Sequence, residues 1–225
     1  MRSGRGARSG RVPDAAVRRL PVYLRVLEDL RQREIDIVSS AELARRTGFS
    51  SEQIRKDLTY FGAFGTRGVG YRTETLSIQL REILGLDREV PAALVGAGNL
   101  GTALARYNIL RHRDVRIVGI FDNDPQKVGT SIEGVPILAT DDLEKVVPEQ
   151  GIRMAVITVP AEAAQEMASR LVQVGVEAIL NFSPTQLRVP PGVYVQNIDL
   201  SIELRSLAYY VSAGRRQEDM GSTRG

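Results

Sequence analysis

The stretch "VGAGNLG", residues 95–101, decides the fold of the second half of the chain. It follows a short apolar segment, Val90–Val95, and runs directly into the amphipathic helical pattern "TALARYNILRH". In a strand–turn–helix unit of this kind Gly96 makes the tight turn, Gly98 lets the backbone approach a pyrophosphate, and Gly101 lets the helix pack on the strand. The free N–H groups of the helix N-terminus attract the anion. We expect the whole loop to contact a dinucleotide: Gly96, Ala97, Gly98, Asn99, Leu100 and Gly101.

A carboxylate after the next strand strengthens this prediction. The pattern "VRIVGIFDND" predicts a strand that ends at Asp122, 21 residues after Gly101. This is close to the spacing at which an acidic residue binds the adenosine ribose hydroxyls of NAD. The acid favours NAD over NADP, although Lys127 nearby leaves some room for a 2′-phosphate.

Further strands and helices alternate up to residue 198. The segment "MAVITVP" predicts a buried strand with Thr158, Val159 and Pro160 at its carboxyl end. Ligands of open α/β sheets bind at such strand ends, so these three residues are candidate cofactor contacts. The fold class expected for residues 90–198 is therefore α/β, a Rossmann-like doubly wound parallel sheet.

The first half has helical periodicity. Residues 1–19 are rich in Gly, Arg and Ser and are expected to be a disordered basic tail, followed by an N-terminal domain over residues 20–86. One helical stripe comprises Leu20, Tyr23, Leu24, Leu27 and Leu30. Two capping patterns, "SSAELARRTG" and "SSEQIRKDLTYF", then predict two short helices joined by a tight turn.

Two short helices in this order are typical of a helix-turn-helix, in which the second helix enters the DNA major groove. Its expected outer face carries Gln53, Arg55 and Lys56, whose side chains suit base edges and phosphates. The glycine-rich "TYFGAFGTRGVGY", residues 59–71, then predicts a wing with Arg67 at its tip. The alternative is a solvated helical hairpin covered by a surface loop.

Charge and composition narrow the classes of function. Residues 1–90 carry 17 Lys and Arg against 12 Asp and Glu, whereas the rest of the chain is slightly acidic. The basic half is the natural place for DNA. The absence of cysteine and the single histidine, His112, argue against disulfides, thiol catalysis and a metal site. No apolar run spans a membrane and no signal peptide is evident, so we expect a cytoplasmic protein.

The chain lacks the groups that a dehydrogenase needs. A proton must move with the hydride, but His112 lies at the far end of the helix and Tyr107 has no lysine at useful spacing. No substrate domain is evident. We therefore expect a cofactor that is bound and sensed, not turned over. Two alternatives stay open: a small NAD-dependent oxidoreductase, and a winged-helix regulator that binds another nucleotide such as coenzyme A.

The last helical pattern, "NIDLSIELRSLAYYVSAG", has an apolar stripe that needs a partner surface. It packs either on its own sheet or, as in twofold dimers of DNA readers, on a second subunit. We expect residues 199–213 to be a swapped dimerisation helix of a homodimer and residues 214–225 to be a disordered tail.

The motifs together resemble those of the Rex family of redox-sensing transcriptional repressors. The resemblance rests on "SSAELARRTGFSSEQIRKDLTYFGAFGTRGVGY", "VGAGNLG", "FDNDPQKVG", "ITVP" and "NFSP", and extends from about Leu20 to Val211. It implies a homodimer that binds double-stranded operator DNA when NADH is scarce, releases it when NADH rises relative to NAD+, and controls respiratory and fermentative genes. It also implies that Arg55 and Lys56 contact bases and that Tyr107 and Asp199 respond to nicotinamide.

NAD+ and NADH differ only in the charge and hydrogens of one ring, so only the nicotinamide pocket distinguishes them. An apolar pocket selects the neutral NADH ring, whereas a free carboxylate selects NAD+. We hypothesise that Asp199 of the partner is neutralised by a hydrogen bond from Tyr107 in the NADH state.

Overall fold

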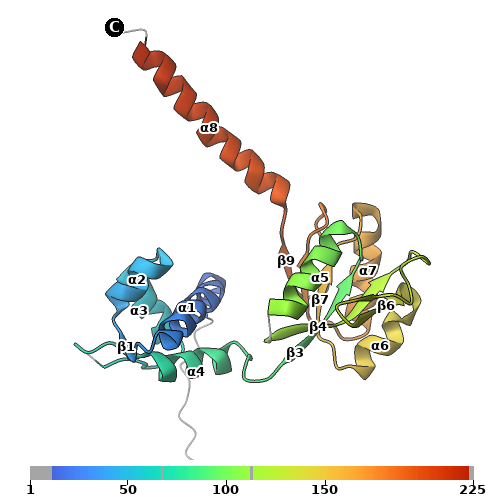
Figure 1. Cartoon of the computed structure of the whole chain (residues 1–225), viewed down its shortest axis with the longest axis horizontal. Coiled ribbons are helices and arrows are strands. Elements are labelled where there is room, and N and C mark those ends of the chain that lie inside the picture. The colour runs from blue at the N-terminus through green and yellow to red at the C-terminus, as the bar shows by residue number, and fades with distance from the viewer. Residues whose placement is uncertain (1–11, 67, 112–113, 223–225) are drawn as a thin grey trace, which may run out of the picture. The chain divides into compact units, whose positions relative to one another are not determined.

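The computed structural model describes residues 12–66, 68–111 and 114–222, and divides the chain into two compact units between Arg88 and Glu89 (Figure 1). The wing residue Arg67 and His112 lie outside the described residues.

Unit 1 consists of helices around one apolar core. Its elements are α1 (Asp14–Gln32), β1 (Ile37–Val38), α2 (Ser40–Thr47), α3 (Ser51–Thr59), β2 (Tyr71–Arg72) and α4 (Thr73–Ile83). All five residues of the predicted first stripe are buried, and they pack with Leu43 of α2, Ile54 and Leu58 of α3, and Leu76 and Leu80 of α4. This arrangement confirms the predicted helix-turn-helix pair, α2 and α3. In the sequence, α1 precedes the pair and α4 follows it.

Both short helices begin as the capping patterns predict. The Ser39 hydroxyl accepts the Glu42 N–H at 3.1 Å, and the Ser50 hydroxyl accepts the Gln53 N–H at 3.1 Å. Gly48 ends α2 with a φ of 77°, in the left-handed region that favours glycine. The turn between the helices is therefore fixed by local backbone chemistry.

The wing differs in detail from the predicted hairpin. Among the described residues of unit 1, antiparallel pairing is confined to β1 with β2 and to an isolated bridge between Thr66 and Gly70. Gly62, Gly68 and Gly70 have positive φ, but Gly65 does not. A Cβ on Gly65 would lie 2.8 Å from the Tyr71 ring, so close packing and not backbone conformation requires that glycine.

Unit 2 is built on a seven-stranded sheet with the order β5-β6-β4-β3-β7-β8-β9. Its strands are β3 (Val90–Val95), β4 (Val115–Asp122), β5 (Ser131–Ile132), β6 (Val135–Ala139), β7 (Met154–Ile157), β8 (Ala178–Asn181) and β9 (Tyr194–Asn197). Every pairing is parallel except that of the edge strand β5 with β6. The order reverses between β3 and β7, which is the switch point where doubly wound sheets bind ligands.

Helices cover both faces of the sheet. Helix α5 (Asn99–Arg111) lies on one face, where Ala105 packs with Leu94 and Ile120. Helices α6 (Leu143–Glu149) and α7 (Ala161–Gln173) lie on the other, and a short 3₁₀ turn, Thr140–Asp142, precedes α6 (Figure 1). These layers confirm the predicted doubly wound α/β fold.

The terminal boundaries differ from the expected ones. Helix α1 begins at Asp14, inside the segment expected to be disordered, because Ala16 and Leu20 are both fully buried and extend the apolar stripe toward the N-terminus. The final helix, α8 (Leu200–Ser222), continues past Gly214 because the segment contains no proline and its two glycines lower helix stability only moderately.

Candidate functional site

The glycine loop has the backbone geometry that its sequence predicts. Gly96 has a φ of 103°, and a Cβ there would lie 2.9 Å from the Thr158 carbonyl carbon. A Cβ on Gly101 would lie 1.9 Å from the Gly96 carbonyl oxygen, so α5 packs too closely for any side chain. Nothing lies within 4 Å of a Cβ built on Gly98. Gly96 and Gly101 are therefore needed for folding, while Gly98 borders open space.

Asp122 holds this loop. It is only 6% exposed, its Oδ2 accepts the Ala97 N–H at 2.6 Å, and its Oδ1 accepts the Asp124 N–H at 2.9 Å. Thr158 secures the loop from the other side, donating to the Gly96 carbonyl at 2.7 Å. The two strand ends on either side of β3 thus fix the glycine turn by hydrogen bonds to its backbone.

A pocket of about 500 Å³ opens beside the loop at the carboxyl ends of the strands. It brings together six of the predicted cofactor residues: Gly96, Gly98, Asp122, Thr158, Val159 and Pro160. Its remaining lining was missed by the sequence interpretation, apart from Lys127: Phe121, Asn123, Thr140, Asp141, Ala163, Glu166, Met167 and Arg170. Most of these come from the 3₁₀ turn and α7, which no motif connects to the glycine loop. The pocket lies at the switch point, where the fold predicts a ligand.

The two cationic side chains of the pocket are both paired. The Lys127 ammonium lies 3.4 Å from Asp122 and 3.5 Å from Asp124. Arg170 donates to both carboxylate oxygens of Glu144, at 2.6 and 2.8 Å, and to the Thr140 carbonyl at 2.7 Å. Its hydrogen bonds lower the pKa of Glu144. Asp141 and Glu166 also line the pocket. It therefore offers little net positive charge for a phosphate beyond the pyrophosphate of a dinucleotide.

Tyr107 and Asp199 do not line this pocket. Tyr107 lies on α5 and is 60% exposed. Asp199 precedes α8, where its Oδ1 accepts the Ser201 N–H at 2.9 Å and the Ser201 hydroxyl. These bonds lower the pKa of Asp199, and the bond from the Ser201 hydroxyl has the largest effect. One chain alone therefore does not bring this pair to the dinucleotide pocket.

The outward face of α3 carries the predicted DNA contacts. Arg55 and Lys56 are exposed, and the Arg55 Nη1 donates to the Ser40 hydroxyl at 2.8 Å. Gln53 is partly buried, and its amide nitrogen donates to Asp57 at 2.7 Å. A hollow of about 530 Å³ lies between this helix and the wing and is lined by Ser39, Ser40, Arg55, Leu58, Thr59 and wing residues 62–66 and 68–71.

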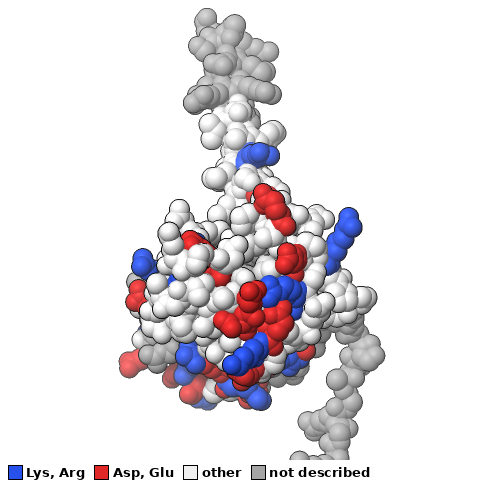
Figure 2. Space-filling view, turned by 90° about the vertical axis from the view of Figure 1, so that its right-hand side faces the viewer, with Lys and Arg blue, Asp and Glu red and all other residues white. Residues whose placement is uncertain are grey.

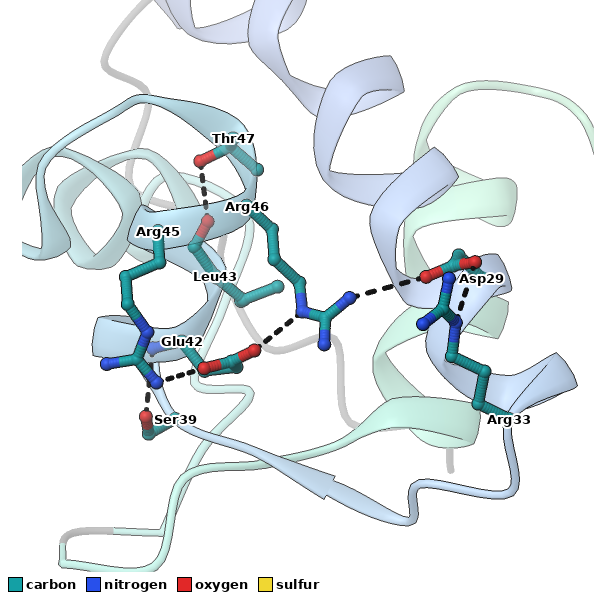
Figure 3. A network of polar contacts seen from close by, with 8 residues as sticks. All are labelled: Asp29, Arg33, Ser39, Glu42, Leu43, Arg45, Arg46 and Thr47. Carbon is teal, nitrogen blue, oxygen red and sulfur yellow. Dashed lines mark hydrogen bonds and ion pairs between the residues drawn. The ribbon is translucent and has the colours of Figure 1, made fainter.

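The basic residues of α2 are engaged within the unit (Figure 3). Arg45 and Arg46 both pair with Glu42, and Arg46 extends to Asp29 on α1 at 3.4 Å. Arg33 pairs with the same Asp29 at 3.1 Å. These bonds tie α2 to α1, whereas Arg55 and Lys56 of α3 make no ion pair among those described.

The face of the molecule drawn in Figure 2 differs from the outward face of α3 in its charge pattern. Figure 2 shows acidic and basic side chains intermixed on the side that faces right in Figure 1, without a continuous basic patch among the residues described there. A polyanion has little reason to bind that surface.

The structure also limits other kinds of site. Among the described residues there is no group of three His, Asp or Glu side chains able to hold a metal ion. No helix within the described ranges is long and apolar enough to cross a bilayer.

Comparisons with known proteins give the family. Residues 11–59 match a family model described as "Putative DNA-binding protein N-terminus", and residues 87–185 match one described as "CoA binding domain". A redox-sensing transcriptional repressor Rex of Natranaerobius thermophilus is 49% identical over 93% of this chain and 95% of its own length. The chain belongs to the Rex family. The Rex protein of Streptomyces coelicolor is 48% identical over 90% of this chain and 79% of its own length.

Solved Rex-family structures extend the likeness to three dimensions. The structure of RSP in complex with β-NAD+ and operator DNA covers 95% of this chain and 99% of its own, with a TM-score of 0.85 and 36% identity. The structure of RSP with β-NADH covers 94% of this chain and 100% of its own, with a TM-score of 0.81 and 35% identity. Rex proteins are transcriptional repressors, which confirms the interpretation of this chain as a regulator and removes the oxidoreductase alternative.

Proposed function

We propose that this chain represses transcription by binding operator DNA through unit 1, and that NADH binding to unit 2 releases the DNA. One observation carries the proposal: a single Rex-family chain contains both a recognition helix with exposed cations and a pocket beside a glycine loop at the switch point of the sheet. An acid/base set for hydride chemistry was not evident in the sequence. The ligand is therefore an effector.

NAD(H) suits the pocket better than NADP(H) or coenzyme A. The pocket's Asp122, Asp141 and Glu166 would repel the extra phosphate that NADP carries on the 2′ and coenzyme A on the 3′ ribose oxygen. Lys127 and Arg170 are already paired with carboxylates and offer that phosphate little compensation. Asp122 still has a lone pair for a ribose hydroxyl on Oδ1, which accepts one described hydrogen bond, from the Asp124 N–H, whereas Oδ2 accepts from both Ala97 and Lys127.

Discrimination between NADH and NAD+ is assigned to Tyr107 and Asp199. A lowered pKa keeps Asp199 ionised at neutral pH, and an ionised carboxylate near the ring favours NAD+. When Tyr107 of the other subunit donates a hydrogen bond to it, that preference weakens and closure around NADH is favoured. Shifting the ratio of the DNA-releasing to the DNA-binding state of the dimer from 1:99 to 99:1 needs about 5.5 kcal/mol of differential affinity, which two cofactors share.

The pair is expected to meet only in a homodimer. Residues 200–212 of α8 are exposed along their whole length, and the apolar side chains Leu200, Leu204, Leu207 and Val211 are each more than half exposed. Such a helix needs a partner surface. A second copy of the chain, exchanging α8, supplies that surface and places two recognition helices for paired half-sites.

DNA binding is assigned to Gln53, Arg55, Lys56 and Arg67. The first three are on α3, and Arg67 belongs to the wing, outside the described residues. Arg55 and Lys56 suit guanine edges and phosphates, whereas Gln53 suits adenine. Because a repressor must reach its operator DNA, this one is expected to act in the cytoplasm.

Selection of duplex DNA from a random library tests this function. Without nucleotide, and at fixed salt, the protein should enrich a twofold-symmetric sequence. The same selection with NADH present should lose that enrichment. Absence of any enriched sequence in either selection would contradict the proposed function.

A further inference from the structure

Asp57 is a carboxylate with no exposure to solvent on the helix proposed to read DNA. Four hydrogen bonds satisfy it. The Arg19 Nε and Nη2 donate over 2.6 and 2.8 Å, the Tyr23 hydroxyl over 2.7 Å, and the Gln53 amide nitrogen over 2.7 Å. A buried charge with so many directional bonds has one allowed orientation.

The two donors from α1 are themselves held in place. The Tyr23 ring meets the Phe49 ring edge to face at 5.8 Å, and the Arg19 guanidinium lies over the Phe49 ring at 5.8 Å. Phe49 is in the turn between α2 and α3. The rotation of α3 about its own axis is therefore set by charged and aromatic contacts to α1 and the turn, in addition to apolar packing.

The remaining donor, Gln53, lies one helical turn before Asp57 and is partly exposed. A primary amide has two N–H donors and one carbonyl acceptor. The bond to Asp57 uses one N–H, so the other N–H and the carbonyl oxygen stay available. One donor and one acceptor are what the N7 and N6 edge of adenine requires. A side chain already fixed in this way loses little rotamer entropy when it binds.

We propose that Asp57 is a positioning residue for base reading, which orients the Gln53 amide toward adenine in the major groove. The proposal rests on the proposed function of α3 as the recognition helix. Asp57 itself touches no DNA; it acts through Gln53. The exposed cations Arg55 and Lys56 have no bond to Asp57 among those described, so they are expected to supply affinity independently of it.

The test measures base preference rather than affinity alone. A duplex operator selected with the unaltered protein is compared with duplexes that carry each base-pair substitution in turn. We expect Gln53→Ala to relax the preference at one adenine position per half-site by roughly 5- to 150-fold. Asp57→Asn should relax the same position, and the double variant should relax it no further than Gln53→Ala does. Binding to unrelated duplex DNA should change less than about twofold.

Glu42→Gln is the matched control. It disturbs a network of similar size in the same unit, on α2, and this network has no bond to α3 among those described. Glu42→Gln should therefore leave every base preference intact. If Asp57→Asn does not fold, Tyr23→Phe, which removes one of the four bonds, is measured in its place and should relax the same position to a smaller extent.

Three results would overturn the proposal: an unchanged preference in Asp57→Asn, or in Tyr23→Phe where Asp57→Asn does not fold; an equal loss on operator and unrelated DNA; or an added loss in the double variant. Failure of the unaltered protein to select any operator would instead contradict the proposed function.

Discussion

The backbone N–H of Ala97 donates to Oδ2 of Asp122 over 2.6 Å, so the carboxylate expected to bind ribose also holds the glycine loop. Asp122→Ala removes both roles, and because neither involves the nicotinamide ring, NADH and NAD+ should lose affinity equally. A hydrogen bond to a charged group contributes about 1.5–3 kcal/mol, so the loss should be at least 10-fold. Calorimetric titration with each nucleotide measures it.

Asp124→Ala is the control for this variant. Asp124 accepts the Gln126 N–H and lies near Lys127, but it does not touch the loop. Asp124→Ala should therefore lower the affinity for both nucleotides several times less than Asp122→Ala does. A changed NADH/NAD+ preference in Asp122→Ala would show that Asp122 senses the nicotinamide ring after all.

Two glycines of the same loop should fail in different ways. Gly101→Ala places a Cβ 1.9 Å from the Gly96 carbonyl oxygen, so it should lower the melting temperature of unit 2 markedly. Gly98→Ala meets no protein atom within 4 Å, so it should melt normally but bind dinucleotide at least 10-fold more weakly. Thermal unfolding with and without NADH separates the two. Normal NADH binding by a folded Gly98→Ala would disprove the close approach of the cofactor.

Tyr107→Phe should uncouple NADH binding from DNA release. The change removes one hydroxyl from a 60% exposed ring, so folding should be unaffected. Without the proposed hydrogen bond to Asp199, NADH should still bind but should release the operator at a much higher concentration. DNA binding by fluorescence anisotropy, titrated with NADH, measures this shift. Full NADH-triggered release by the variant would eliminate the proposed switch.

The Asp57 cluster should make unit 1 sensitive to acid. Burial alone would raise the pKa of Asp57, but hydrogen bonds from Arg19, Tyr23 and Gln53 outweigh it and lower the pKa below its ordinary value of 3.8. A lowered pKa stabilises the folded state above pH 3.8, and this stabilisation is lost as the pH falls through the still lower folded value.

Asp57→Asn should therefore cost stability at pH 7 and progressively less below pH 4. Breaking a buried ion pair lowers the free energy of unfolding by about 3–5 kcal/mol. Because the Arg19 side chain is 21% exposed to solvent, the expected loss lies at or below that range. Urea unfolding at pH 7 and pH 3 provides the comparison. An equal difference at both pH values would contradict ionisation of Asp57 in the folded protein.

The sequence predicted those features that depend on local chemistry. Glycines with a required conformation, such as Gly48 and Gly96, and serine caps, such as Ser39 and Ser50, act within a few residues and were recognised. The doubly wound parallel sheet was predicted from the alternation of strands and helices, because parallel strands are joined by crossover helices.

What the sequence did not reveal depends on contacts between distant segments. Thr140 and Arg170 enter the dinucleotide pocket from segments that no motif links to the glycine loop. Asp57 lies next to Leu58 on the inward face of α3, so an acid at a buried position was a visible signal. Its partner Arg19, 38 residues earlier, was assigned to a tail because the extension of α1 through Ala16 depends on tertiary packing.

The most direct test of the account is release of a labelled operator by mixtures of NADH and NAD+ at constant total concentration and fixed salt. Redox sensing predicts that the bound fraction falls as the NADH share rises, and that NADPH in place of NADH leaves the DNA bound. If the bound fraction followed the total nucleotide concentration and not the ratio, or if NADPH released the DNA equally well, the assignment of sensing to the nicotinamide ring in an NAD-specific pocket would be wrong.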